Sequence, residues 1–151
     1  MKIRRRAFLH SVAATCLAAF CVSAQAEPDL LQPDEAFQVS ARRVEPGVVE
    51  LEYIIAPGYH LYRDRFRFKT DNPAVTVAAI YLPPPLEKFD KAMGQNMRYY
   101  TEHVMVRVRL SGADRAAKLV ATAQGCASIV GVCYAPITKA FSMPAIGGQQ
   151  G

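Results

Sequence analysis

The sequence predicts an all-β protein built as an antiparallel β-sandwich. Apolar and polar residues alternate with a period of two in several short runs, which is typical of strands with one buried face and one wet face. Turn-forming Gly, Pro and Asn residues separate these runs. No segment keeps a period of 3.6 residues, so we expect no long helix. Seven or eight short strands in about 110 residues fit a sandwich.

The clearest strands are expected where one face is apolar and the other is charged. In residues 104–110 valines alternate with arginines, and in 49–55 two glutamates fall between apolar residues. The same pattern predicts strands at 37–41, 65–69, 75–82, 118–124 and 140–143.

Two segments depart from this alternation. Residues 33–36 are expected to form a single helical turn. Residues 83–96 begin with three prolines and do not alternate, so we expect a long loop there. Such a loop is either functional or a simple surface excursion.

Residues 1–26 are expected to be a signal peptide that is removed after Ala26. Basic residues precede an apolar stretch at 11–22, and small residues stand at the −1 and −3 positions of the cleavage site. The apolar stretch is too short to span a bilayer, which takes about 20 residues.

The arginines at 5–6 resemble a twin-arginine motif, but we expect export by the general secretory (Sec) route. A lipoprotein cysteine at Cys16 or Cys21 is a weaker alternative. We therefore expect one exported domain at 27–145, followed by a disordered tail at 146–151.

The charge of the exported part gives no reason to expect a nucleic-acid or membrane-surface partner. The whole chain has 18 Lys and Arg against 13 Asp and Glu. Four of the basic residues lie within 1–26, which leaves 14 against 13 in the rest. The basic character of the whole chain therefore says little about such partners.

Cys126 and Cys133 are the cysteines that remain after removal of the signal peptide. An even number suits a disulfide in an oxidising compartment, and the six residues between them can form a hairpin-like connection. A structural bond closing such a loop would contribute roughly 2.5 kcal/mol by the chain-entropy estimate. The residues alone favour this structural bond and leave open a redox pair, or a metal site with His60 and His103. The Cys-x-x-Cys spacing of thioredoxins is absent.

Several segments together resemble one known family. The cysteines lie in Gly-Cys-Ala at 125–127 and in Cys-Tyr-x-Pro-x-Thr-Lys at 133–139, and Pro-Gly-Tyr-His-Leu-Tyr-Arg at 57–63 precedes them. Residues 82–94 match the length of the loop that caps the cysteines in that family. These motifs are similar to those of the N-terminal domain of the thiol:disulfide interchange protein DsbD, over roughly residues 30–143.

The resemblance implies an immunoglobulin-like sandwich in the periplasm that exchanges thiols and disulfides as a protein-disulfide reductase, without a cofactor. Electrons would come from a membrane-embedded thiol donor, here a separate protein. They would pass to disulfide isomerases or to thioredoxin-like proteins of cytochrome c maturation. By position, Cys133 would attack the client disulfide and Cys126 would resolve the mixed disulfide. The alternative is an exported binding module with a purely structural disulfide.

The resemblance also implies a cap over the cysteines, with an acidic residue close to them. The residues expected to line or cap the site are Asp90, Met93, Gly94, Phe89, Tyr62, His60 and Tyr134. This chain departs from the family pattern in having six rather than five residues between the cysteines. It also has Ala92-Met93 where an aromatic residue precedes the glycine, Lys91 in place of a second acid, and His60 in place of an aromatic.

Overall fold

The computed structural model describes residues 29–91 and 93–146. The predicted signal peptide and most of the predicted tail therefore lie outside the described residues. The elements, in order, are α1 (Pro33–Ala36), β1 (Phe37–Glu45), β2 (Val48–Ile55), β3 (Tyr59–Tyr62), η1 (Arg63–Arg65), β4 (Arg67–Thr70), β5 (Thr76–Tyr81), β6 (Leu86–Asp90), β7 (Gln95–Tyr100), β8 (His103–Ser111), β9 (Ala117–Ala123), β10 (Gly125–Ala127), β11 (Val132–Cys133) and β12 (Ile137–Met143).

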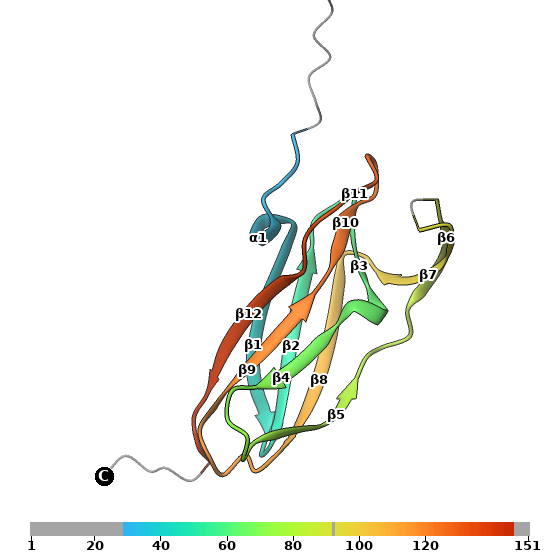
Figure 1. The fold of residues 1–151 in the computed structure, drawn as a ribbon. Helices are drawn as coiled ribbons and strands as arrows, with labels where there is room; N and C mark the ends of the chain where they lie inside the picture. Colours follow the sequence, from blue (N-terminus) through green and yellow to red (C-terminus); the bar gives the residue numbers. More distant parts are fainter. Residues whose placement is uncertain (1–28, 92, 147–151) are drawn as a thin grey trace, which may run out of the picture.

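The strands of the described residues form three antiparallel sheets. The first has the order β1-β2-β8-β5 and the second has the order β12-β9-β4. Figure 1 shows β12, β9 and β4 lying across β1, β2 and β8 as the two layers of a sandwich. The third sheet, β11-β10-β3-β7-β6, lies at one end of these layers. The expected all-β antiparallel sandwich is confirmed.

The core fills the space between the two layers. On β8 the alternation predicted from the sequence is observed, because Val104, Val106 and Val108 are all buried while Arg107 between them is exposed. Leu119 of β9 closes the core from the opposite layer and is fully buried. None of the helices within the described residues is long and apolar enough to cross a membrane.

The outer face of the first sheet holds a buried charge. Glu50 of β2 is 3 % exposed and lies between Arg42 of β1 and Arg107 of β8 in the register. Arg107 Nε donates to Glu50 Oε2 at 2.9 Å, and Arg42 donates to the other carboxylate oxygen. The hydrogen bond from Arg107 and the charges of both arginines lower the pKa of Glu50, although burial opposes them. This bridge ties three strands together.

Residues 83–96, predicted as a loop, instead contain β6, the turn after it and the start of β7, which together form a β-hairpin. β6 pairs with β7 from Leu86↔Tyr99 to Asp90↔Gln95. The alternation is missing because both faces of β6 are largely exposed, so neither face had to be apolar throughout. The same criterion missed the short strands β3, β10 and β11, and the described residues form more strands than the seven or eight expected.

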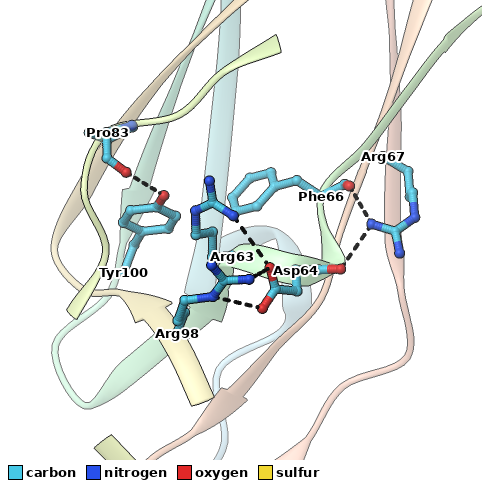
Figure 2. A network of polar contacts seen from close by, with 7 residues as sticks. All are labelled: Arg63, Asp64, Phe66, Arg67, Pro83, Arg98 and Tyr100. Atoms are coloured by element: carbon cyan, nitrogen blue, oxygen red, sulfur yellow. Dashed lines mark hydrogen bonds and ion pairs between the residues drawn. The ribbon is translucent and has the colours of Figure 1, made fainter. Parts of the chain in front are cut away.

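Polar contacts hold the base of this hairpin against the sandwich (Figure 2). Arg98 of β7 forms a two-pronged ion pair with Asp64 of η1, at 2.7 and 3.2 Å. Arg63 also contacts Asp64, at 3.4 Å. Tyr100 Oη donates to the carbonyl oxygen of Pro83 at 2.8 Å, which fixes the segment that leads into β6. The hairpin is therefore anchored where it leaves the body of the domain.

Candidate active site

Cys126 and Cys133 form a disulfide between two paired strands. They are direct partners in the β10–β11 register, with an S–S distance of 2.02 Å and a Cα–Cα distance of 3.9 Å. Of the six intervening residues, Ala127 and Val132 pair as the last rung of the two strands, and residues 128–131 form the turn. The Gly131 N–H donates to the Ala127 carbonyl at 2.9 Å. The pairing that spacing alone left open is thus present in the structure.

The two sulfurs differ in their access to solvent. Cys126 lies on β10, between β11 and β3, and is 2 % exposed. Cys133 lies on β11, which is the edge strand of this sheet, and is exposed. A reagent or protein arriving from solvent therefore reaches Cys133 first.

Gly125 explains how Cys126 reaches this buried position. A Cβ atom at residue 125 would lie 2.2 Å from the carbonyl oxygen of His60 and 2.7 Å from the ring of Phe37. Only a residue without a side chain lets β10 approach β3 and the core so closely. The glycine before the first cysteine is therefore required by packing.

A polar chain leads from Cys126 to the β6–β7 hairpin. Tyr62 Oη lies 3.4 Å from Cys126 Sγ and donates a hydrogen bond to Asp90 Oδ2 at 2.6 Å. Asp90 Oδ1 accepts the N–H of Met93 at 3.1 Å. Burial, followed by the hydrogen bond to the Asp90 carboxylate and its charge, raises the pKa of Tyr62. The phenol therefore stays protonated at neutral pH, between the sulfur and the carboxylate.

His60 completes a row across the sheet. It is the register partner of Cys126, so its side chain lies on the same face as both cysteines. Its Nδ1 is 2.7 Å from Ser128 Oγ, in the loop between the cysteines. Its ring packs edge-on against Tyr62 and Tyr99, with centroids 4.8 and 5.5 Å away.

The titration of His60 follows from this setting. Burial is the main cause that lowers its pKa, the charge of Asp90 opposes the shift, and the charge of Lys88 adds to it. The imidazole is therefore neutral at pH 7.

The disulfide opens into a cavity of about 580 Å³ between the β6–β7 hairpin and the β10–β11 hairpin. Of the residues expected around the site, His60, Tyr62, Phe89 and Asp90 line this cavity together with both cysteines. Several other residues line the cavity that were not expected at the site from the sequence, among them Lys88, Met97, Tyr99, Thr101 and Ser128. Strand register would have placed Tyr99 there, since it pairs with Tyr62.

The remaining expected residues, Met93, Gly94 and Tyr134, do not line the cavity. Met93 and Gly94 belong to the turn after β6, where Gly94 has a φ of +66° and its N–H donates to the Asp90 carbonyl at 2.8 Å. Tyr134 follows Cys133 and packs against Phe37, with ring centroids 5.6 Å apart. Its hydroxyl donates to the Leu31 carbonyl at 2.8 Å, so Tyr134 anchors the N-terminal segment.

A metal site from the cysteines and both histidines is not assembled. His103 lies on β8, in a different sheet, where its Nε2 is 3.2 Å from Glu52 Oε1. Across the described part of the chain, no group of three or more His, Cys, Asp or Glu residues could hold a metal ion.

Comparison with known proteins shows which family the chain belongs to. The family described as "Thiol:disulfide interchange protein DsbD, N-terminal" matches residues 27–145. The chain belongs to this family. DsbD of Ralstonia nicotianae is 36 % identical over 125 residues, which cover 83 % of this chain and 20 % of that protein. The chain thus spans about a fifth of the length of such relatives.

Solved structures agree with this assignment. The reduced DsbD N-terminal domain of Neisseria meningitidis superposes with a TM-score of 0.67 at 31 % identity, covering 78 % of this chain and 92 % of that one. The complex between the DsbD N-terminal and PilB N-terminal domains of the same species gives a TM-score of 0.63 at 32 % identity, covering 80 % and 90 %. The immunoglobulin-like sandwich expected from the family is confirmed.

Proposed function

We propose that this protein is a thiol–disulfide exchange domain that passes two electrons at a time from a thiol donor to disulfide-bonded proteins of the periplasm. The observation that carries the proposal is the unequal pair of cysteines, one exposed and one buried, joined in one disulfide at the mouth of a cavity. A pair used in exchange needs one sulfur that partners can reach and a second that is held ready beside it.

The reaction runs in two steps from the reduced domain. The Cys133 thiolate attacks a client disulfide, forms a mixed disulfide and expels one client thiolate, which takes up a proton. Cys126 then attacks Cys133 Sγ, which re-forms the bond between them and expels the second client thiolate. The client gains two electrons and two protons, and the domain loses them.

The buried thiol must lose its proton before the second step. Tyr62 Oη, 3.4 Å from Cys126 Sγ, can accept this proton while it passes its own to Asp90. Because the Asp90 carboxylate is already hydrogen-bonded to Tyr62, both transfers take place between neighbouring atoms. These residues would thus assist the resolving step without contacting the client disulfide.

The client and the electron donor would both react with the Cys126–Cys133 pair. A relative is known in complex with the PilB N-terminal domain, which supports a protein client at the cysteine face. A membrane-embedded thiol donor would return electrons by attack on the same exposed Cys133. Export by the predicted Sec-type signal peptide at residues 1–26 would place the domain in the periplasm, where both partners are accessible.

The redox potential of the Cys126–Cys133 bond tests the proposal against a purely structural disulfide. The exported protein is equilibrated in thiol buffers of graded potential and its free thiols are labelled and counted by mass. We expect a potential above about −300 mV, the level below which structural disulfides typically lie. A lower potential, together with a large loss of melting temperature on reduction, would show that the bond is only structural.

A further inference from the structure

Two lysines stand at the rim of the disulfide cavity. Lys88 belongs to β6 and Lys91 follows that strand directly, and both side chains are exposed. Both line the same cavity as Cys126 and Cys133. A protein that brings its disulfide to Cys133 must therefore pass close to these ammonium groups.

The charge of this rim is positive. Its charged lining residues are Lys88, Lys91 and Asp90, since the burial-lowered pKa of His60 keeps that ring neutral at pH 7. Among the described residues, neither lysine has a carboxylate within 4.0 Å, whereas the oxygens of Asp90 accept hydrogen bonds from Tyr62 and Met93.

The field of Lys88 reaches the interior of the site. Its charge contributes to lowering the pKa of His60, which is the cross-strand partner of Cys126. The charge of Lys88 therefore acts on the residue that pairs directly with Cys126 across the sheet. The same positive field that disfavours a proton on His60 would attract a negative charge on an approaching partner.

Apolar side chains provide the rest of the contact surface. Phe89 is 57 % exposed on one side of the cavity, and Ile129, on the other side, is 87 % exposed. The described site therefore combines exposed apolar contacts with an excess of positive charge on the β6 side.

We propose that Lys88 and Lys91 make this site select disulfide partners that carry acidic groups beside their disulfide. This inference rests on the exchange function proposed above. The chemistry is unchanged: the reduced pair gives two electrons and two protons to the partner, whose disulfide becomes two thiols. The lysines act on the encounter, through charge complementarity with the partner.

Two small disulfides of opposite charge test the selection directly. Reduced protein is mixed with oxidised glutathione, which is anionic, or with cystamine, which is cationic, and the reaction is quenched with acid and followed by thiol labelling and mass. The protein is compared with a Lys88→Glu/Lys91→Glu variant. Lys69→Glu is the matched control, because Lys69 is an exposed lysine on β4 that does not line the cavity. Equal melting temperatures establish that all three are folded.

We expect the double variant to react about threefold more slowly with oxidised glutathione and about threefold faster with cystamine at low salt. Both differences should shrink at 0.5 M salt, which reduces the screening length to about 4 Å. The control should behave as the unchanged protein. If the ratio of the two rates is the same in all three proteins, the selection by charge is wrong while exchange stands. If neither reagent oxidises the unchanged protein, the exchange function itself fails.

Discussion

Replacing Gly125 by alanine should destabilise the domain through one close contact. The added Cβ would lie 2.2 Å from the His60 carbonyl oxygen, where an ordinary contact is 3.4 Å or more. The strand carrying Cys126 must therefore move back by about 1 Å, and the ring of Phe37 must yield as well. Overpacking of this kind costs about 1–3 kcal/mol, a considerable part of the roughly 5–15 kcal/mol that stabilises a typical domain.

Urea unfolding measures this loss, with Gly94→Ala as the control. Gly94 has a φ of +66°, but a Cβ added there would meet no atom within 4 Å, so alanine at this position carries only the strain of the left-handed conformation, about 1 kcal/mol. The Gly125 variant should lose more stability than the control, and its Cys126 thiol should react faster with iodoacetamide after reduction. A Gly125 variant as stable as the Gly94 variant would refute the packing argument.

Three further changes test the site and the sheet. Tyr62→Phe removes the hydroxyl beside Cys126 and should slow the resolving step about tenfold. When the reduced variant is mixed with oxidised glutathione, the mixed disulfide on Cys133 should therefore accumulate. If it does not accumulate, the proposed proton path is excluded. By NMR, His60 should titrate below its ordinary pKa of 6.5. The contribution of neutral His60 to the free energy of unfolding should then be complete above pH 6.5 and be lost as the pH falls through the lower pKa of the folded state. A His60→Phe variant should lack this dependence of stability on pH. An NMR titration midpoint of His60 above 6.5 would contradict the burial argument. Glu50→Gln should lower the free energy of unfolding at pH 7, because Arg107 favours the carboxylate of Glu50 in the folded state. The difference in stability between the variant and the unchanged protein should disappear as the pH falls through the lowered pKa of Glu50. A loss of stability that does not depend on pH would contradict this.

The strands that could be predicted from sequence are those with one face in the core. In β8 the inward valines and outward arginines follow directly from burial on one side. The β6–β7 hairpin has no such face, since Leu86 and Phe89 are 52 % and 57 % exposed, and its sequence therefore looked like a loop. The alternation of apolar and polar residues indicates a strand only where one face of that strand is buried. It therefore does not indicate a hairpin that extends from the body of the domain into solvent.

The candidate site was predicted only in part for a related reason. The family resemblance of residues 57–63 and 82–94 indicated His60, Tyr62 and Asp90, all of which line the cavity. Their arrangement depends on strand order, because Cys126 is buried only by being placed between β11 and β3. Neither strand could be predicted from its own short sequence. Tyr134 immediately follows Cys133, but its ring packs against Phe37 in the core and not in the cavity.

The most direct test of unequal cysteine roles uses two single-cysteine variants and oxidised glutathione. Cys126→Ala leaves the exposed Cys133 without its partner, and Cys133→Ala leaves the buried Cys126 alone. Each reduced variant is mixed with the reagent and the glutathione adduct is located by peptide mass. We expect a rapid and stable adduct on Cys133 and at least tenfold slower modification of Cys126. Equal rates, or faster modification of Cys126, would contradict the assignment of Cys133 as the attacking sulfur.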